Sequence, residues 1–484
     1  SGSDFADSCA CAIRDWQHTN GVHSFFPIVA CSSLFCLGCV KLGPDHQAPT
    51  LDLPTQYSQK GVSWKRTSPP QVYTHSTWWK VYGDRTLDQL AQATAEQNVS
   101  IQAAASRLKE ARSLSRATRT TLLPSLDFNG DLQRTTVNFF GGLAQNRLDI
   151  FQLPIDLAYE VDLWGRVRRN VESAEAQAAS AEATVVATKL SLTADTALTY
   201  WSLRALDAEK AQVKKSIALR KESLVLNEAR FRAGTANELD ASRAKTELAT
   251  VESELIGLDK KRAELLNALA VLTGRPAGTL HIEEQPELPT PPKIPAGVPS
   301  DLLLRRPDLY AAERNVAAAN AQIGVAKAAF FPSLRLRAGT GTNATQLGDL
   351  FDGDAVAWSL GTSLTYPIIG QARIRADYKA AIARHETASL DYKQAGLIAM
   401  RETEDSLTGL SFLEKQEQSQ QQAADAAKQT LKLSRQRYEA GLTNYLEVVE
   451  AERTLLQSER LVTSLRAQRL ALTTQLIKAL GGAW

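Results

Sequence analysis

The stretch Arg230-Phe-Arg-Ala-Gly234-Thr-Ala-Asn237-Glu-Leu239 decides the fold, because it returns later as Arg437-Tyr-Glu-Ala-Gly441-Leu-Thr-Asn444-Tyr-Leu446. The same spacing continues without insertion towards the end of the chain, where Gly274 matches Gly481. Upstream, Leu122-Leu-Pro124-Ser-Leu126 matches Phe330-Phe-Pro332-Ser-Leu334. A period of about 200 residues is longer than any solenoid repeat. The sequence therefore predicts one tandem duplication of a large structural unit.

The composition is that of a large folded protein without a strong charge signature. The chain has 484 residues, of which 44% are hydrophobic and 22% are charged, and its net charge is +2. This balance argues against a basic nucleic-acid-binding protein, so nucleic acid is not expected as a partner. All five cysteines lie at or before Cys39, so neither a disulfide framework nor a zinc-binding spacing is expected downstream.

Residues 1–38 are interpreted as a leader. Residues 25–38 are apolar, too few to span a bilayer as a helix but enough for the hydrophobic region of a signal peptide. This stretch ends in Leu37-Gly38-Cys39, which resembles the lipobox of bacterial lipoproteins and implies cleavage before Cys39 and lipidation of its thiol. Cys36 departs from the usual leucine of a lipobox. The alternative is an ordinary cleaved leader, or a remnant that is not native.

Within each copy the hydrophobic period changes between helix and strand. Residues 87–122 have apolar side chains at three-and-four spacing and predict a helix. Residues 153–163 have an apolar side chain at every odd position and predict a strand, with residues 126–137 as its hairpin partner. After Gly165 a proline-free run of roughly 60 residues predicts one long helix, and residues 237–272 predict a helix that runs back.

The second copy repeats this scheme. Helices are expected at residues 309–331, 374–438 and 444–480, and strands at residues 334–342 and 356–368. The chain is therefore expected to contain a leader, an anchor and equatorial segment, a first repeat, a proline-rich crossover and a second repeat, at residues 1–38, 39–86, 87–276, 277–300 and 301–484.

The number of strands constrains the assembly. Each chain supplies four predicted strands, and an open strand edge in lipid leaves backbone groups unpaired at a cost of several kcal/mol each. Two chains would give eight strands and a barrel filled by its own side chains, whereas three give twelve strands and an open lumen. The predicted fold is mostly α with a transmembrane β-barrel: a homotrimer that forms a 12-stranded barrel and a long α-helical periplasmic tunnel.

Several motifs resemble, in the same order, those of the TolC-type lipoprotein branch of outer-membrane factors, which belong to tripartite multidrug efflux pumps. The motifs extend to the C-terminus and include Trp78-Trp79-Lys80-Val81-Tyr82-Gly83-Asp84, Leu303-Leu304-Arg305-Arg306-Pro307-Asp308, Phe330-Phe331-Pro332-Ser333-Leu334 and Ala479-Leu480-Gly481-Gly482-Ala483-Trp484. The resemblance implies a trimeric exit duct in the bacterial outer membrane that extends into the periplasm. It implies outer-membrane lipid, a periplasmic adaptor (membrane fusion protein) and an inner-membrane transporter as partners, and small amphipathic drugs, detergents or bile-like compounds as cargo.

No motif predicts catalysis. The sequence has no GxxxxGK[ST] run and no HExxH motif, and its six histidines lack ligand spacing. No catalytic residue, cofactor or metal is therefore expected, and the energy for transport is expected to come from another protein.

The resemblance implies a periplasmic gate beside the second turn, at Leu446, Glu450 and Arg453. Their spacing of four and three residues puts the three side chains on one helical face. Around a three-fold axis this face would form a leucine ring beside a ring of three carboxylates, whose repulsion arginine or cations would relieve. The alternative is that Leu446 belongs to the coiled-coil core and Glu450 is a solvated partner of Arg453.

Two further sets of residues have both a functional and a structural interpretation. The turns are expected to contact the adaptor, or are only turns built from glycine and asparagine; their residues are Gly234, Thr235, Asn237, Gly441, Leu442, Thr443 and Asn444. The polar face of the strand at 153–163 is expected to make the barrel lumen acidic, or is only the water-facing side of a barrel; its carboxylates are Asp156, Glu160 and Asp162.

Two other functions stay open. The exit duct of a type I protein-secretion system has the same fold, and the sequence does not separate it from drug efflux. A periplasmic coiled-coil adaptor or scaffold would also have long helices rich in alanine, leucine, glutamate and arginine. The two strand hairpins, each with one apolar face, argue against that second function.

Overall fold

The chain folds into two compact units, a sheet and a helical unit. The computed structural model describes residues 40–51, 54, 77–139, 144–235, 237–294 and 306–482. The sheet unit contains Pro124–Arg168 and Ala328–Ile368, and the helical unit contains Gly43–Leu123, Arg169–Lys327 and Ile369–Trp484. The predicted leader and Cys39 lie outside the described residues.

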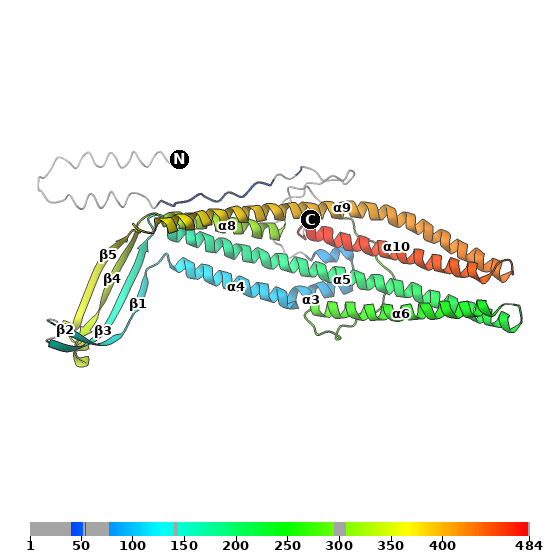
Figure 1. The fold of residues 1–484 in the computed structure, drawn as a ribbon, viewed down its shortest axis with the longest axis horizontal. Coiled ribbons are helices and arrows are strands. Elements are labelled where there is room, and N and C mark those ends of the chain that lie inside the picture. The colour runs from blue at the N-terminus through cyan, green and yellow to red at the C-terminus, as the bar shows by residue number, and fades with distance from the viewer. Residues whose placement is uncertain are drawn as a thin grey trace. The chain divides into compact units, whose positions relative to one another are not determined.

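Two long helices dominate the helical unit (Figure 1). They are α5 (Arg166–Arg232), with 67 residues, and α9 (Gln371–Glu439), with 69 residues. At the usual helical rise each is about 100 Å long. A short 3-10 helix and shorter α-helices accompany them: η1 (Trp78–Tyr82), α3 (Arg85–Gln97), α4 (Val99–Thr120), α6 (Glu238–Leu272), α8 (Pro307–Ala328) and α10 (Tyr445–Ala479). The predictions of a long helix and a return helix in each half are confirmed within a few residues.

The helix predicted over residues 87–122 is in fact two helices, because Asn98 separates α3 from α4. The backbone of Asn98 is extended, and its side-chain oxygen accepts hydrogen bonds from the backbone N–H of Ser100 at 2.9 Å and of Ile101 at 3.4 Å. Asparagine is a preferred N-cap, since its side chain pairs with N–H groups that lack a partner at a helix start. Its amide also donates to the carbonyl of Leu272 at 2.8 Å, which ties the break to the end of α6.

The two distal turns have the same local geometry. α5 ends where the N–H of Thr235 donates to the carbonyl of Arg230, and α9 ends where the N–H of Leu442 donates to the carbonyl of Arg437, both at 2.9 Å. Gly234 and Gly441 supply the left-handed backbone that this type of helix end requires, each with a φ of 74°. The two matching stretches of sequence therefore form matching turns.

An aromatic cluster forms a core of the helical unit and joins η1 and α3 to α5, α6 and α10. Trp201 is 1% exposed, and its ring centroid lies 4.9 Å from that of Tyr82 and 5.1 Å from that of Tyr200. Trp78 and Trp79 are buried in the same cluster. These tryptophans therefore pack in the helical core.

The sheet unit is a single antiparallel sheet in the order β1-β3-β4-β5, with β2 also paired with β3. The strands are β1 (Ser125–Phe128), β2 (Asp131–Phe139), β3 (Ala144–Val161), β4 (Ser333–Ala344) and β5 (Val356–Thr365). In register, Leu126 lies opposite Leu157, Leu157 opposite Ala338, and Ala338 opposite Leu360. One face of the sheet is therefore apolar from edge to edge.

The structure corrects two strand boundaries. The strand predicted over residues 126–137 is interrupted at Asn129 and Gly130, so that β1 and β2 pair with different parts of β3. β3 itself begins at Ala144, earlier than predicted, because residues 144–152 lack the strict alternation that identified residues 153–163. Between β4 and β5 the chain forms two short 3-10 helices, η4 (Leu347–Phe351) and η5 (Gly353–Ala355).

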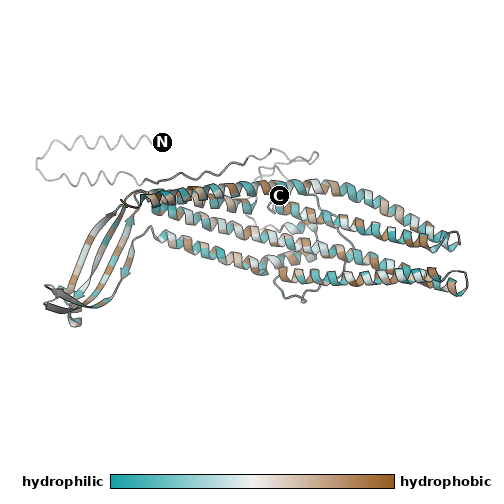
Figure 2. Ribbon diagram, viewed as in Figure 1, coloured by the Kyte–Doolittle hydropathy of each residue, from teal (hydrophilic) through white to brown (hydrophobic). Residues whose placement is uncertain are grey.

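The helices mix hydrophobic and hydrophilic residues along their length (Figure 2). Among the described residues, no helix has a stretch long and apolar enough to cross a membrane.

Replacing Gly274 with alanine should destabilise the protein more than the same change at Gly234. Both glycines have left-handed backbone, with φ of 73° and 74°, so each substitution carries a conformational cost of about 1–2 kcal/mol. A Cβ on Gly274 would also lie 2.5 Å from the carbonyl oxygen of Gln97, whereas one on Gly234 would meet no atom within 4 Å. Apparent thermal midpoints of the two variants in detergent measure the difference, and equal losses would contradict the predicted clash.

Candidate functional site

The two distal turns are held together within one chain (Figure 1). The guanidinium of Arg230, near the end of α5, donates to the carbonyl of Tyr438 at 3.2 Å and to that of Glu439 at 3.1 Å. The same group lies 4.6 Å from the centroid of the Tyr438 ring. The Tyr438 hydroxyl donates to Asn227 Oδ1 at 2.6 Å. These contacts neutralise the carbonyl end of α9 and fix the two turns side by side.

The predicted adaptor-contact residues lie at these turns, and most of them are exposed. Leu442 is 71% exposed. Asn237 and Asn444 cap α6 and α10, each accepting a hydrogen bond from a backbone N–H of the first helical turn. Gly234, Thr235, Gly441 and Thr443 complete the set. The structural role of the glycines and asparagines is therefore clear, and the contact with an adaptor stays a prediction.

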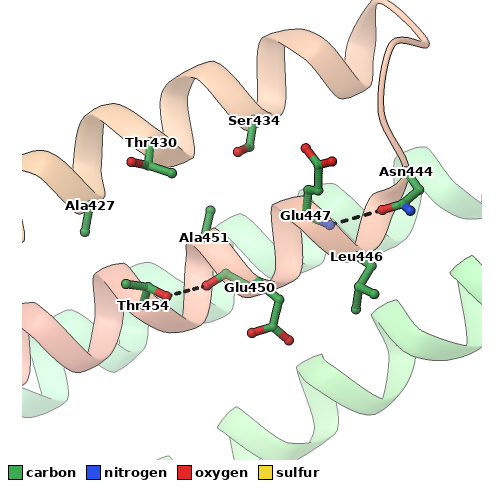
Figure 3. Close-up of a pocket in the computed structure, with 9 residues that line it drawn as sticks. All are labelled: Ala427, Thr430, Ser434, Asn444, Leu446, Glu447, Glu450, Ala451 and Thr454. Carbon is green, nitrogen blue, oxygen red and sulfur yellow. Dashed lines mark hydrogen bonds between the residues drawn. The ribbon is translucent and has the colours of Figure 1, made fainter.

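The predicted gate residues share the outward side of α10. Leu446 is 42% exposed, and the side chains of Glu450 and Arg453 are 60% and 54% exposed. Figure 3 shows Leu446 and Glu450 pointing to the same side of the helix, away from α9. The core side of this turn is occupied instead by Tyr445 and Val448, which are 1% and 2% exposed. Leu446 therefore lies outside the packed core of this turn in the single chain, and the gate at Leu446, Glu450 and Arg453 stays a prediction.

A groove lies between the ends of α9 and α10 beside these residues (Figure 3). Its volume is about 510 Å³. Leu446, Glu450 and Ala451 line it from α10, and Thr430 and Ser434 from α9. The lining is mostly small or polar, whereas the two helices pack through Leu431, Tyr438, Tyr445 and Val448 in the core beneath the groove.

Glu450 and Arg453 are paired, but Arg453 has a second partner that the sequence did not reveal. Arg453 Nη1 lies 3.3 Å from Glu450 Oε1. Its guanidinium also donates to both carboxylate oxygens of Glu247 on α6, with Nε 3.3 Å from Oε2. The side chain of Glu247 is 11% exposed, so this second contact is the more sheltered of the two. Arg453 therefore connects the predicted gate face, the side of α10 that carries Leu446 and Glu450, to α6.

Glu247 belongs to a buried network that spans four helices. Arg220 on α5 donates to the Glu247 carboxylate and, at 2.9 Å, to the Glu247 carbonyl. Arg435 on α9 donates to Glu452 Oε1 at 2.7 Å, and Arg220 Nε lies 4.0 Å from Glu452 Oε2. The network thus links α5, α6, α9 and α10 next to the predicted gate face. Its members are Arg220, Glu247, Arg435, Glu452 and Arg453.

Charges in this network shift the pKa values of Glu247 and Arg453. Burial raises the pKa of the Glu247 carboxyl, but the hydrogen bond from Arg453 and the charge of Arg220 outweigh burial and hold the pKa below its ordinary value. The hydrogen bond to Glu247 raises the pKa of Arg453. Glu247 and Arg453 are therefore both ionised at neutral pH.

The three predicted lumen carboxylates, Asp156 and Glu160 on β3 and Asp162 directly after it, have different surroundings. Glu160 accepts two hydrogen bonds of 2.8 Å from Arg166, and Arg335 Nε lies 3.7 Å from Glu160. Asp162 accepts hydrogen bonds of 3.0 Å from the backbone N–H groups of Val167 and Arg168, and so anchors the start of α5. Asp156 lies opposite Gly339 in the sheet register. Two of the three carboxylates are thus already paired with cationic or N–H groups.

The comparison with known proteins settles the family. The family model described as outer membrane efflux protein matches the chain twice, over residues 90–275 and 298–482. The chain belongs to the outer membrane efflux protein family. It is therefore an outer-membrane protein that extends into the periplasm, and the resemblance of its motifs to TolC-type efflux channels is confirmed.

Individual relatives cover nearly the whole chain. The solvent efflux pump outer membrane protein SrpC of Pseudomonas putida is 30% identical over 459 residues, which are 93% of this chain and 97% of that protein. The pyoverdine export outer membrane protein OpmQ of Pseudomonas aeruginosa is 32% identical over 415 residues, 84% of this chain and 87% of that protein.

Solved structures agree with the fold. The outer-membrane channel OprN superimposes with a TM-score of 0.84 at 28% identity, over 92% of this chain and 99% of that chain. The outer membrane protein VceC of Vibrio cholerae gives a TM-score of 0.79 at 29% identity, over 84% and 99% of the two chains. OprN is an outer-membrane channel, and the family is one of outer-membrane efflux proteins rather than of enzymes. Within the described part of this efflux protein, no group of three or more His, Cys, Asp or Glu residues could hold a metal ion.

Replacing Glu247 with glutamine should lower the stability of the protein at pH 7. It should also make that stability less sensitive to acid. A carboxylate with a lowered folded-state pKa contributes stability that is complete above its ordinary pKa of 4.5 and is lost as pH falls through the folded value. Breaking such a sheltered pair costs about 3–5 kcal/mol.

Thermal midpoints of wild type and Glu247→Gln, measured from pH 7 to pH 3, test this prediction. The gap between the two should be widest at pH 7 and should close below pH 4.5. Glu264→Gln, at a carboxylate that is 62% exposed, serves as the control and should follow wild type. A constant gap at every pH would contradict the role assigned to the Glu247 charge.

Proposed function

We propose that this efflux protein is the trimeric outer-membrane exit duct of a tripartite multidrug efflux system. In this proposal it carries drugs, detergents or bile-like compounds from the periplasm to the exterior, together with a periplasmic adaptor and an inner-membrane transporter that supplies the energy. Family membership supports an efflux channel over a periplasmic coiled-coil scaffold. The relatives named for solvent and toluene efflux support small amphipathic cargo.

One observation carries the proposal: the sheet has an exposed apolar face. Trp358 is 79% exposed and Leu360 is 77% exposed, although both lie within regular strand β5. Other large apolar side chains of the sheet are similarly exposed: Leu126, Phe128, Leu132, Val356 and Leu364. A large exposed apolar surface on a sheet is what a bilayer would cover.

The edges of the sheet support assembly from several copies. Within the described residues β5 pairs with β4 alone, and β1 pairs with β3 alone. In lipid such edges must be paired, because no water is present to satisfy their N–H and C=O groups. Joining β5 of one copy to β1 of the next would close the sheet. We infer three copies, since β1 and β2 continue one another along β3 and twelve strands leave an open lumen.

The opposite face of the sheet would then line the lumen. It carries Asp156 and Glu160, but also Arg335 and Arg337, which lie across from Glu160 and Ala158. The proposed acidic lumen also includes Asp162. Arginine would thus partly neutralise the negative charge of the lumen. Selection for cations would accordingly be weak.

The gate proposal follows from the outward side of α10. Three copies around one axis would bring Leu446 and Glu450 into rings, and Arg453 would offset part of the negative charge. Exposure of these side chains in a single chain supports the proposal, because they are available to a second copy or to the channel axis. The exposed turns at Leu442 and its neighbours are the proposed contact with the adaptor.

A strain that lacks the gene should regain resistance to deoxycholate, sodium dodecyl sulfate or a hydrophobic antibiotic when wild-type gene is restored. The protein extracted in detergent should have the mass of three chains of 52.8 kDa each, less any leader. Light scattering coupled to gel filtration measures the assembly. Trp358→Lys combined with Leu360→Lys should abolish both the restored resistance and the trimer, since two charges would face lipid. Unchanged susceptibility together with a detergent-independent monomer would overturn the proposed function.

Opening of the proposed gate can be measured as conductance. Leu446→Ala with Glu450→Ala should raise single-channel conductance in planar bilayers and admit vancomycin into the periplasm, because the leucine constriction and the carboxylate ring are both removed. Leu461→Ala with Glu447→Ala is the control, since Leu461 on the same helix is 43% exposed. Equal conductance and permeability for all three proteins would place the constriction elsewhere.

Lipidation of Cys39 can be tested by mass. Membrane-extracted protein should begin at Cys39 and carry added acyl mass, and Cys39→Ala should lose that mass while still assembling, because the apolar face of the sheet would suffice for insertion. Intact-mass analysis of both proteins decides the matter. Mature wild-type protein without acyl mass would reject the lipobox.

A further inference from the structure

Helix α4 carries a row of four cationic side chains on one face. Lys109, Arg112, Arg116 and Arg119 are spaced by three, four and three residues, which aligns them along the helix axis. All four are exposed, and the side chains of Arg112 and Arg119 are 51% and 73% exposed. We call these four residues the α4 basic row.

The α4 basic row is only partly neutralised. Arg112 lies 3.1 Å from Glu182 and Arg119 lies 4.0 Å from Glu175, both on α5, and the two carboxylates are themselves more than half exposed. Such exposed pairs contribute little. Lys109 and Arg116 have no ion pair with any described residue. A row of positive charge therefore faces solvent.

The second half of the chain shows what covers the equivalent face of its own helix. Pro124 follows α4 and Pro332 follows α8 within the same Pro-Ser-Leu triplet, so the residues of the two helices can be matched by their distance from that proline. The α4 basic row then matches Ala317, Asn320, Gly324 and Lys327 of α8.

On α8 this face is covered by a segment of the chain itself, residues 43–46, which belongs to no helix or strand. Asn320 donates to the carbonyl of Pro44 at 2.9 Å. Gly43 lies so close that a Cβ added to it would be 2.6 Å from the Cα of Gly324. Asn320 is consequently only 4% exposed. Arg112, which occupies the matching position on α4, is exposed instead.

We propose that the α4 basic row is the docking surface for an extended acidic peptide segment of a partner protein. The covered face of α8 shows that a short non-helical segment of chain can pack on a helix at this position. The charge of the row selects carboxylates. The chain's own residues 52–76 do not match, because they contain Lys60, Lys65 and Arg66 against the single acidic residue Asp52.

The spacing of the row suits such a peptide. From Lys109 to Arg119 the helix rises about 15 Å. An extended chain advances about 3.3 Å per residue and presents alternate side chains to one side, so carboxylates at every second position recur about every 6.6 Å. Neighbouring cations of the row are about 4.5–6 Å apart along the axis. Three such carboxylates span about 13 Å, so a peptide with alternating glutamates can meet three of the cations at once.

The test uses the full-length protein in detergent and a fluorescein-labelled peptide of four Glu-Ser repeats. Fluorescence anisotropy should show binding that weakens as salt is raised. Arg112→Gln with Arg116→Gln should weaken binding at least tenfold. Lys260→Gln with Lys261→Gln, an exposed pair of cations on α6, should leave it unchanged. A Gln-Ser peptide of the same length should not bind. The charge reversal Arg116→Glu provides a second variant at a side chain without an ion pair.

Three results would overturn the proposal. The first is no binding of the Glu-Ser peptide by wild type, or equal losses in the row variant and the α6 control. The second is that wild type does not bind the peptide while the row variant has a lower trimer fraction. That result would make this face an interface between copies. The third is binding of phosphatidylglycerol vesicles that the row variant loses while the peptide does not bind, which would make it a lipid-binding surface.

Discussion

Backbone hydrogen bonding at the edges of the sheet is the constraint on which the rest of the structure depends. β1 and β5 each have one partner within the described chain, and the sheet between them has an exposed apolar face. Water could form hydrogen bonds with the backbone N–H and C=O groups of these edges. Lipid, which would cover the apolar face, could not. In the proposed assembly the edges are paired between copies, so one physical requirement gives both membrane insertion and the trimer.

In the helical unit the constraint is the relative register of neighbouring helices, because two of them are about 100 Å long. Alanine and serine are frequent in α5, so its packing surface is shallow, and charged residues supply many of the links to neighbouring helices. Lys210 lies 2.5 Å from Asp259 of α6, and Asp207 lies 2.7 Å from Arg262 of α6. Buried ion pairs add little net stability, but leaving one partner alone is costly, so we infer that they specify register. The network around Glu247 does this where the proposed gate must be positioned.

Sequence periodicity predicted the parts of the fold that depend on local chemistry. The turns at Gly234 and Gly441, the long helices and the return helices follow from glycine, asparagine and hydrophobic spacing. The break at Asn98 was missed because a capping asparagine inside an apolar pattern resembles any other polar residue until its hydrogen bonds are known. The start of β3 at Ala144 was missed because its register is set by pairing rather than by alternation. The family resemblance implied the gate residues, which stay a prediction, and helical spacing placed them on one face, but the sequence did not reveal Glu247 as the partner of Arg453. That contact joins residues far apart in the sequence, and no local pattern encodes it.

Cross-linking of the sheet edges tests the central claim most directly. Within one chain β1 and β5 are separated by β3 and β4, a distance of about 14 Å, which no disulfide can span. Paired edges of neighbouring copies would instead bring opposing Cα atoms to about 4.5–5.5 Å. With the native cysteines replaced, Asp127→Cys in β1 is combined in turn with cysteine at Ala357, Ser359, Gly361 and Ser363 in β5. The account predicts that at least one pair forms oxidant-dependent dimers and trimers in membranes, seen on non-reducing gels. Monomer alone for every pair, from protein that is inserted and functional, would contradict it.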